Sequence, residues 1–446
     1  MIKVITYGTY DMLHYGHIRL LERAKALGDY LIVGVTSDDF DRERGKINVK
    51  QSLIERIDAI KNTKLADEII VEEYEGQKID DIRRLGVDIF TVGSDWIDHF
   101  DYLNEYCKVV YLDRTMGVSS TEIRAKKEKL RLGLYGNFPF ISKVFNEVKY
   151  VNGIEVTAFY SFDISGLDKI LKAIPVITSD YDKFLDHVDC IYLYSPSNHF
   201  KYIKKALERG IHVLCESPIV TEPAQFAQLE EIAKANNCVL VEAMRTAYSM
   251  AYSRLLLLLK GGVIGDVVSI DSICTSLREV DVENKEKMSK TWNSICEWGP
   301  TAMLPIFQIL GIDYCKKYIV SKMANTQYPY DFFTKVAFVY PNAVASLKVG
   351  VGVKSEGELI ISGTKGYIYV PAPWWKTDYF EVRFEDATKN KRYFYQLDGE
   401  GIRYQFVAFK RAIESKISDN YISQNVSMAI VKVVSDFYHK IDFIKI

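Results

Sequence analysis

The sequence lacks the features that mark membrane, disulfide-bonded and zinc-stabilised proteins. Its longest purely apolar run, residues 255–259, is far shorter than the roughly 20 residues that a membrane-spanning helix needs. The seven cysteines are odd in number and form no CxxC pair, which argues against a disulfide framework and against a zinc site. The opening residues MIKVITYG form a strand pattern and not a signal peptide. These absences predict a cytoplasmic protein with reduced thiols and no membrane insertion.

A charge excess of one sign is also lacking. The 57 Lys and Arg residues nearly balance the 59 Asp and Glu residues, so the net charge is -2, and nucleic acid is not an expected partner. The chain has no linker rich in glycine, serine or proline, no low-complexity segment and no short repeat. What it does have is length and apolar content: 446 residues, 48% of them hydrophobic, predict two or three packed domains.

β-rich runs alternate with amphipathic helical stretches near the start of the chain, which predicts a parallel sheet with crossover helices. A helix is expected at 17–27, and strands are expected at 3–7, 30–36, 68–71, 88–92 and 109–112. Ser119 and Glu122 fit a capping box, which predicts a further helix over 119–129.

A second strand-first pattern begins directly afterwards. Strands are expected at 130–135, 154–159, 190–194 and 212–215, with helices between them, which indicates a second doubly wound unit. From about residue 262 to 398, strands rich in valine, tyrosine and threonine dominate, and two helices close the chain. The expected fold class is α/β: a Rossmann-like domain at 1–128, a second Rossmann domain at 129–250, and an α+β open-faced sheet domain at 251–446.

The first constellation with chemical character is His14-Tyr15-Gly16-His17, which follows the end of the first expected strand. A helix N-terminus concentrates unpaired N–H groups and positive dipole, which suits phosphate. Gly8 and Gly16 allow close approach of the backbone to a ligand. Two imidazoles beside such a site can donate to the phosphate oxygens on which negative charge grows during transfer. The alternative is that these are ordinary capping or core histidines.

The second constellation is the segment 114–121, RTMGVSST, after the last strand of the first unit. A guanidinium, three hydroxyl groups and a new helix N-terminus converge on one short loop. Hydroxyls and N–H groups can cradle the distal phosphates of a nucleotide while arginine neutralises them. The alternative is a well-capped helix with a surface arginine.

Together these segments resemble the nucleotidylyltransferase superfamily with the HxGH signature and, more narrowly, the bacterial glycerol-3-phosphate cytidylyltransferases. The resemblance covers residues 1 to about 125 and includes VITYGTYDMLHYGHIRLLERAKALGDYLIVGV, VGSDW and RTMGVSSTEI. It implies transfer of a cytidylyl group from CTP, with Mg²⁺ on the triphosphate, to a polyol phosphate, most simply sn-glycerol 3-phosphate. The product would be CDP-glycerol, a precursor of a cell-surface polymer such as teichoic acid or capsule.

The resemblance also implies roles for individual residues. The expected catalytic groups are His14, His17, Lys46 and Arg114. The expected nucleotide-binding residues are Thr9, Tyr10, Gly16, Thr115, Ser119, Ser120 and Thr121. The expected substrate-binding residues are Asp11, Arg44, Lys78 and Asp95. Two positions depart from the family pattern, because Arg44 stands where lysine is usual and Lys64 where arginine is usual. No metal site built from protein ligands is expected.

Residues 131–446 resemble the Gfo/Idh/MocA oxidoreductases. The resemblance rests on the segments SPSNH at 195–199, HVLCESP at 212–218, EAMR at 242–245, GVIGDV at 262–267 and GTKG at 363–366. The resemblance implies a Rossmann unit followed by an open-faced sheet domain that commonly pairs into dimers. The NAD(P)-contacting positions would be Gly136, Asn137, Ser161, Ser195 and Glu216.

The hydride-transfer machinery of that family is incomplete in this sequence. Phe138 occupies a position where the dinucleotide fingerprint needs glycine, Ser161 offers no carboxylate, and Ser217 stands where the family has its catalytic lysine. The catalytic histidine falls near Thr301, with Glu297 preceding it. Three alternatives remain: a non-catalytic module for homodimerisation, an NAD(P)H-dependent reductase that makes the polyol phosphate, and a regulatory sensor.

Overall fold

The computed structural model describes residues 1–43, 49, 51–74, 76–113, 129–136, 140–162, 167–195, 198–278, 280–284, 291–324, 330–395, 397–415 and 421–446. The chain divides into two compact units, Met1–Lys129 and Leu130–Ile446. The domain boundaries expected above remain predictions.

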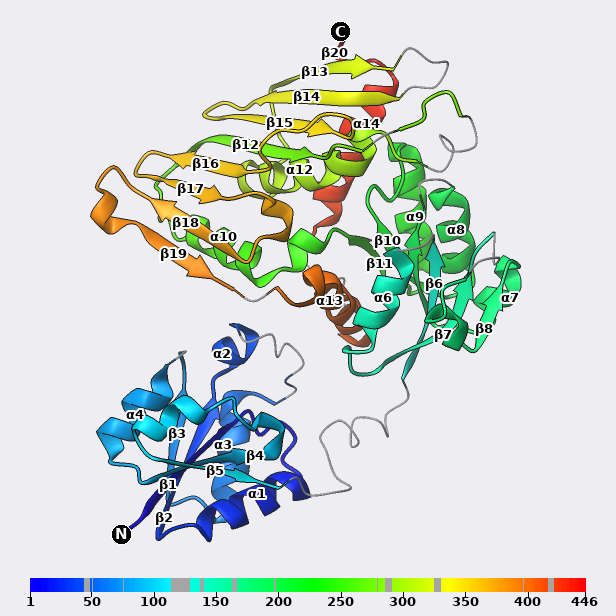
Figure 1. The fold of residues 1–446 in the computed structure, drawn as a ribbon. Helices are drawn as coiled ribbons and strands as arrows, with labels where there is room; N and C mark the ends of the chain where they lie inside the picture. Colours follow the sequence, from blue (N-terminus) through cyan, green and yellow to red (C-terminus); the bar gives the residue numbers. More distant parts are fainter. Residues whose placement is uncertain are drawn as a thin grey trace. The chain divides into compact units, whose positions relative to one another are not determined.

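The first unit is a five-stranded parallel sheet with the strand order β3-β2-β1-β4-β5 (Figure 1). Its strands are β1 (Lys3–Gly8), β2 (Tyr30–Thr36), β3 (Glu68–Glu72), β4 (Ile89–Gly93) and β5 (Lys108–Leu112). Its helices are α1 (Tyr15–Lys25), α2 (Asp38–Glu43), α3 (Leu53–Thr63) and α4 (Gln77–Leu85), with short 3-10 turns η1 (Ser94–Trp96) and η2 (Asp101–Glu105). The strands expected here are present, whereas the expected helix over 119–129 falls almost entirely outside the described residues.

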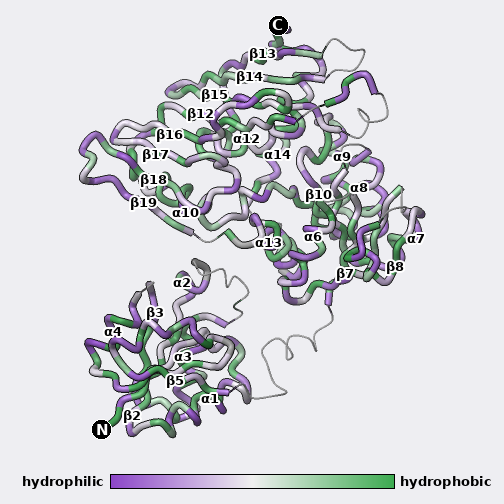
Figure 2. Tube along the Cα trace, in the orientation of Figure 1, coloured by the Kyte–Doolittle hydropathy of each residue, from purple (hydrophilic) through white to green (hydrophobic). Residues whose placement is uncertain are grey.

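Two apolar cores flank this sheet. Val4, Val33 and Val35 pack with α1 and α3 on one face, and Ile5, Ile32 and Phe90 pack with α4 and η2 on the other. Because successive side chains of a strand point to opposite faces, β1 and β2 supply both cores and read as continuous apolar runs. Figure 2 shows this as green strands at the centre of the unit.

The expected boundaries of the first helix were wrong by two residues at each end. The helix runs over Tyr15–Lys25, because His14 has an extended backbone and accepts a hydrogen bond from the Gly16 N–H as the N-cap. A capping side chain satisfies one of the free N–H groups of the first turn, so the helix begins directly after His14.

The second unit begins with a six-stranded parallel sheet in the order β11-β10-β9-β6-β7-β8. Its strands are β6 (Leu130–Gly136), β7 (Ile154–Tyr160), β8 (Val176–Thr178), β9 (Cys190–Tyr194), β10 (His212–Glu216) and β11 (Leu240–Ala243). Its helices are α6 (Phe140–Val148), the 3-10 turn η3 (Leu171–Ala173), α7 (Tyr181–Leu185), α8 (His199–Glu208) and α9 (Pro223–Ala235). The predicted second doubly wound unit is confirmed.

A nine-stranded sheet follows, in the order β19-β18-β17-β16-β12-β15-β14-β13-β20. Its strands are β12 (Val267–Thr275), β13 (Lys316–Met323), β14 (Asp331–Val339), β15 (Val344–Gly350), β16 (Leu359–Gly363), β17 (Tyr367–Val370), β18 (Tyr379–Arg383), β19 (Lys391–Phe394) and β20 (Phe443–Lys445). Most neighbours are antiparallel, but β12 runs parallel to β15 and β13 runs parallel to β20. The predicted, mostly antiparallel sheet is confirmed, with β20 as an addition.

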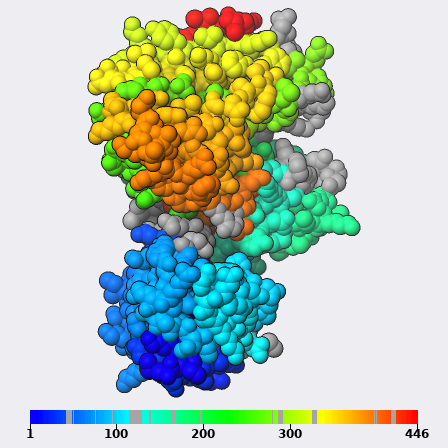
Figure 3. Space-filling model, turned by 60° about the vertical axis from the view of Figure 1, so that its left-hand side comes forward, coloured from blue at the N-terminus to red at the C-terminus, as the bar shows by residue number. Residues whose placement is uncertain are grey.

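The remaining helices and turns belong to the same unit as this sheet. They are η4 (Arg245–Tyr248), α10 (Met250–Lys260), α12 (Ser294–Leu310), η5 (Trp374–Lys376), η6 (Ala387–Lys389), η7 (Asp398–Gly401), α13 (Ile402–Ser415) and α14 (Gln424–Tyr438). Buried and exposed residues alternate along β13, which is typical of a sheet packed on one face and open on the other. Figure 3 shows the residues of this sheet, in yellow and orange, as one broad surface.

Candidate functional site

The candidate site of the first unit lies where its parallel strands end. Ligands of open α/β sheets bind outside the carboxyl ends of the strands. Residues 9–17 follow β1, Lys78 follows β3 and Asp95 follows β4. Arg44 and Lys46 come after β2 in the sequence, and Arg114 comes after β5. The sequence therefore assigned one expected site residue or more to every strand end of this sheet.

Two imidazole rings lie together at the start of α1. The ring centroids of His14 and His17 are 3.8 Å apart at an interplanar angle of 20°, and the ring of Tyr10 meets His17 edge-on at 5.5 Å. His14 is buried and His17 is half-buried. The prediction that both histidines share the hinge between β1 and α1 is consistent with this geometry, which offers two ring nitrogen donors beside one helix N-terminus.

The loop after β1 has an unusual backbone at Tyr10, whose φ is 53°. A positive φ is uncommon for a residue other than glycine. The Tyr10 side chain is only 2% exposed and packs in the core, and burial is the main cause that raises its pKa well above the usual value for tyrosine. Any contact of Tyr10 with a nucleotide would therefore come from its main chain, whereas Gly8, Gly16 and Thr9 lie on the same loop and helix start.

Arg56 of α3 holds this loop in place, a role that the sequence analysis missed. Its guanidinium is fully buried and donates to the carbonyl oxygens of Thr9 at 2.6 Å and Thr36 at 2.9 Å. The same guanidinium forms ion pairs with Asp38 and Asp41. The sequence carried a signal for it: Arg56 stands four residues before the core residue Ile60, on the apolar face of the helix.

Asp11 ties the same loop to the segment that precedes α3. Asp11 is 4% exposed, and its Oδ1 accepts a hydrogen bond of 3.0 Å from the Gln51 N–H. In return, the Oε1 of Gln51 accepts a bond of 2.7 Å from the Met12 N–H. Asp11 therefore orders the loop through its bond to the Gln51 N–H.

Lys78, an expected substrate contact, is held by a buried carboxylate. Its ammonium group forms an ion pair with Glu72, which is fully buried at the end of β3. The Glu72 carboxylate also accepts from the hydroxyl of Thr36, and the Lys78 ammonium lies 4.9 Å from the centroid of the Tyr7 ring. These contacts fix the ammonium position, and Glu72 is a second residue that the sequence analysis missed.

Several expected site residues fall outside the described residues. They are Arg44, Lys46, Arg114, Thr115, Ser119, Ser120 and Thr121 in the first unit and Asn137 in the second. For Asp95 the structure describes only the main chain, which lies in η1 directly after β4. Their expected roles stay predictions.

The second unit places four of its expected cofactor residues along one sheet edge. Gly136 ends β6, Ser161 follows β7, Ser195 follows β9 and Glu216 ends β10. A Cβ on Gly136 would lie 2.5 Å from the carbonyl oxygen of Tyr194, so no side chain fits there. This is the edge at which a doubly wound sheet binds dinucleotides.

The side chains at that edge differ from those that the resemblance implies for hydride transfer. Ser217 stands where a lysine would be needed, and its hydroxyl donates to the fully buried Glu242, which also accepts from Ser427. Ser161 is buried and carries no carboxylate, and Thr301 lies in α12 where the family has a histidine. Glu297 forms an ion pair with Arg278. These described residues therefore supply no lysine and no histidine for hydride transfer.

The surroundings of Glu216, at this edge, perturb its ionisation. Burial raises its pKa to about 7, and the Arg245 guanidinium and the Tyr192 hydroxyl oppose that rise. The Tyr192 hydroxyl donates to the Glu216 carboxylate.

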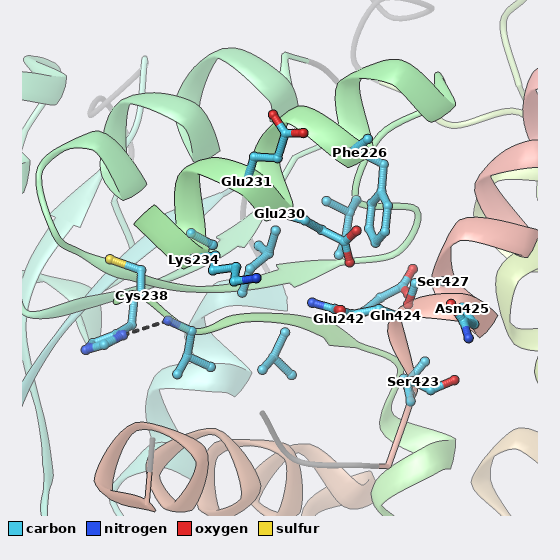
Figure 4. Close-up of a pocket in the computed structure, with 18 of the residues that line it drawn as sticks. Phe226, Glu230, Glu231, Lys234, Cys238, Glu242, Ser423, Gln424, Asn425 and Ser427 are labelled. Atoms are coloured by element: carbon cyan, nitrogen blue, oxygen red, sulfur yellow. Dashed lines mark hydrogen bonds between the residues drawn. The ribbon is translucent and has the colours of Figure 1, made fainter. Parts of the chain in front are cut away.

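A cavity of about 910 Å³ opens elsewhere in the second unit, beside β11, α9 and the start of α14 (Figure 4). The side chains of Glu230, Glu242 and Ser427 face it. It is lined by β11 from Leu240 to Glu242, by His212 at the start of β10 and by Ile219 shortly after β10 ends. The cavity therefore runs along the edge strand β11, and the expected cofactor residues Gly136, Ser161, Ser195 and Glu216 do not line it.

The described part of the chain has neither a membrane-spanning helix nor a cluster of metal ligands. None of its helices is long and apolar enough to cross a membrane. No group of three or more histidine, cysteine, aspartate or glutamate residues there is arranged to hold a metal ion.

Comparison with known proteins agrees with both resemblances. The family described as cytidylyltransferase-like matches residues 5–126, and the oxidoreductase family with an NAD-binding Rossmann fold matches residues 133–244. Glycerol-3-phosphate cytidylyltransferase of Bacillus spizizenii is 49% identical over 129 residues, which are 28% of this chain and 95% of that protein. The enzyme of the same name from Staphylococcus aureus is 45% identical over 124 residues, 28% of this chain and 93% of that protein.

The second unit has solved relatives in fold. A 3-ketoreductase from Actinomadura kijaniata, in complex with NADP and TDP-benzene, covers 72% of this chain and all of its own, with a TM-score of 0.63 and 17% identity. At that identity the likeness shows the fold alone. The cytidylyltransferase-like nucleotidyltransferase domain is thus confirmed, and through it the chain belongs to the cytidylyltransferase family, close to the glycerol-3-phosphate cytidylyltransferases, with a second unit of the Gfo/Idh/MocA two-domain fold.

Proposed function

We propose that this protein transfers the cytidylyl group of CTP to a polyol phosphate, with sn-glycerol 3-phosphate as the acceptor, and releases pyrophosphate. The observation that carries the proposal is the stacked pair of His14 and His17 at the end of β1, in a domain 49% identical to a glycerol-3-phosphate cytidylyltransferase. The CDP-glycerol formed would serve the synthesis of a cell-surface polymer, teichoic acid or capsule, from the cytoplasm.

The reaction is an in-line displacement at the α-phosphorus of CTP. A phosphate oxygen of the polyol phosphate forms the new P–O bond while the bond to the β-phosphate oxygen breaks, and no covalent enzyme intermediate is needed. Such catalysis consists of positioning and charge stabilisation. His14 and His17 would donate to the triphosphate oxygens, together with Lys46 and Arg114. Mg²⁺ bound with CTP would neutralise triphosphate charge.

The acceptor phosphate would meet the ammonium group of Lys78, with Arg44 as a second cation. Lys78 is only 12% exposed in its pair with Glu72, so its position is fixed before substrate arrives. A pre-positioned charge needs little reorganisation during the reaction. Nucleotide contacts are assigned to Thr9, Tyr10, Gly16, Thr115, Ser119, Ser120 and Thr121, and polyol contacts to Asp11 and Asp95.

One experiment tests this assignment directly. The full chain is incubated with CTP, Mg²⁺ and a panel of three- to six-carbon polyol phosphates, and the products are identified by mass spectrometry. The expected product is CDP-glycerol with an equal amount of pyrophosphate. A CDP-polyol from another member of the panel would correct the acceptor, and the absence of any CDP-polyol would reject the function.

For the second unit we propose a non-catalytic role in dimerisation or regulation. The support is the Ser217 hydroxyl, which is committed to Glu242 at the position where hydride transfer needs a lysine. The competing function is an NAD(P)H-dependent reductase that supplies the polyol phosphate. The melting temperature of the protein is measured during titration with NADH and NADPH, because a bound cofactor raises the apparent melting temperature by mass action. The reductase function requires such a rise. We expect no oxidation of either cofactor by keto- or aldo-sugar phosphates.

We propose that the protein is a homodimer and that the open face of the nine-stranded sheet forms the interface. Val339 and Val344 are partners across β14 and β15 and are 36% and 53% exposed, and Tyr318 of β13 is 49% exposed. Contiguous exposed apolar surface favours association. Light scattering should give the mass of a dimer for the wild type and a monomer for Val344→Glu. A monomeric wild type would contradict this proposal.

A further inference from the structure

Three cationic side chains from separate elements of the second unit converge on one carboxylate. The Lys143 ammonium group, from α6, contacts one carboxylate oxygen of Glu400. The other oxygen lies 3.3 Å from a guanidinium nitrogen of Arg245, in η4, and 2.6 Å from the Lys376 ammonium nitrogen, in η5. Three positive charges against one negative charge leave two in excess within this cluster.

The backbone that delivers this carboxylate has an unfavourable conformation. Gly399, Glu400 and Gly401 have φ values of 56°, 55° and 78°, and a positive φ is uncommon for a residue other than glycine. The positive φ of Gly399 favours glycine at this position, and a Cβ there would lie 1.7 Å from an Oε atom of Glu147, which would have to move. The chain therefore adopts a sterically restricted turn that carries Glu400 to the three cations.

The cluster borders the edge of the parallel sheet at which ligands bind. Lys143 lies in the first turns of the helix that follows β6, and Arg245 follows β11. The Arg245 guanidinium lies over the Phe140 ring, 5.4 Å from its centroid, and Phe140 packs against Tyr194 at the end of β9. The carboxyl ends of the strands and the first turn of such a helix favour phosphate groups.

The cations are also accessible to a ligand. The exposed fractions of the Lys143, Arg245 and Lys376 side chains are 42%, 25% and 35%. Ion pairs that are this exposed contribute little to folding stability, so stability alone does not account for three cations around one carboxylate. The pKa of Glu400 is lowered to about 2, because its hydrogen bonds to Lys143 and Lys376 outweigh the effect of burial. The carboxylate is therefore ionised at neutral pH and competes with other anions.

We propose that Lys143, Arg245 and Lys376 form a binding site for a phosphate dianion, and that the Glu400 carboxylate occupies this site until such a ligand displaces it. A phosphate dianion in place of Glu400 would neutralise two of the three positive charges, whereas the single carboxylate neutralises one. A planar guanidinium and two ammonium groups are the side chains that proteins use for phosphate. The ligand is a phosphomonoester, a diphosphate or inorganic phosphate.

Tryptophan fluorescence of the full chain can test the site. Of the five tryptophans, Trp96 lies in the first unit, so the fluorescence of the Trp96→Phe variant comes only from the second unit. One of the remaining tryptophans there, Trp375, directly precedes Lys376. Inorganic phosphate is titrated at constant ionic strength. We expect Glu400→Gln in this background to lower the Kd for phosphate by about tenfold or more. In the parent protein the Glu400 carboxylate occupies the site most of the time, and phosphate can bind only to the fraction of molecules in which the site is open. Lys376→Gln should abolish the response.

The control is Lys389→Gln, because Lys389 is 70% exposed and forms its ion pair with Asp386, apart from the cluster; it should leave the Kd unchanged. Equal Kd values for Glu400→Gln and its parent, or a response that survives Lys376→Gln, would overturn the proposal. If Glu400→Gln fails to fold, Lys376→Arg and Lys376→Gln decide: binding kept only by arginine supports the site, and equal binding refutes it. Tighter binding of glycerol 3-phosphate or of NADP than of inorganic phosphate supports the site and identifies the phosphate-containing ligand that it prefers.

Discussion

The guanidinium of Arg56 donates a hydrogen bond of 2.6 Å to the main-chain carbonyl oxygen of Thr9. Arg56 lies in α3, 47 residues away from the loop that carries the expected nucleotide contacts. A fully buried cation is tolerated because three carbonyl oxygens, of Thr9, Thr36 and Gln51, and two aspartates surround it, as buried charges require. Arg56 therefore links the loop after β1 directly to α3.

Replacement of Arg56 should therefore affect stability and CTP binding together. Arg56→Met leaves Asp41 buried without its cation, and breaking a buried ion pair in this way costs about 3–5 kcal/mol of unfolding free energy. We also expect a raised KM for CTP, because Thr9 loses its anchor. Urea denaturation and steady-state kinetics measure both effects.

The matched control for that variant is Arg19→Met. Arg19 pairs with Glu22 on the surface, and both side chains are 40% exposed, so its loss should change stability by less than about 0.5 kcal/mol. If Arg56→Met behaves like Arg19→Met in both measurements, the anchoring role is wrong.

His14 has two separable roles, as N-cap of α1 and as the expected phosphate donor. His14→Ala removes both, which should lower stability by about 1 kcal/mol and kcat by about 10²–10³. His14→Asn keeps a capping acceptor for the Gly16 N–H and should restore stability while activity stays low. Pyrophosphate release and thermal unfolding are the measurements.

His17→Ala provides the companion test, because the N-cap of α1 is His14 and this variant keeps it; we expect the loss of kcat without the loss of the cap. Turnover near that of the wild type in both alanine variants would reject the catalytic assignment of the pair.

Lys78 should control the use of the acceptor and leave the use of CTP almost unchanged. Lys78→Met removes the ammonium group held by Glu72, and a charged hydrogen bond contributes about 1.5–3 kcal/mol. The KM for the polyol phosphate should accordingly rise about 10- to 100-fold. Lys61→Met, at an exposed position of α3, is the control. A change confined to the KM for CTP would assign Lys78 to the nucleotide instead.

Glu216 should make the second unit less stable as the pH rises. Its pKa in the folded state is about 7, above the ordinary 4.5, so the folded protein prefers the protonated carboxyl group. That preference is fully present below pH 4.5 and is lost as the pH rises through 7. Glu216→Gln removes the charge, and its stability relative to the wild type should rise by up to about 3 kcal/mol across this range.

The measurement is urea denaturation of both proteins at pH 5, 6, 7 and 8. The comparison between variant and wild type isolates Glu216 from the other titrating groups. A difference that stays constant with pH would mean that Glu216 is ionised throughout the range.

Local patterns in the sequence determined a large part of this protein. Continuous apolar runs identified the strands of both parallel sheets, and the HxGH segment placed two histidines on one hinge, because residues three apart at a helix start are neighbours. The order of strands and helices and the family of the first unit followed from these patterns. Helix ends were less well determined, as His14 shows, because a histidine is not a typical N-cap.

Contacts between distant residues were decided only by the tertiary structure. Ser427 donates to Glu242 across 185 residues, and Lys143 meets Glu400 across 257. No periodicity or spacing connects such pairs, because the chain must first fold before their charges and hydrogen bonds can meet. The sequence by itself therefore determined the elements and the hinge that carries His14 and His17. Folding decided that the buried Arg56 holds this hinge, that the Ser217 hydroxyl pairs with Glu242, and that the Glu400 carboxylate lies among three cations.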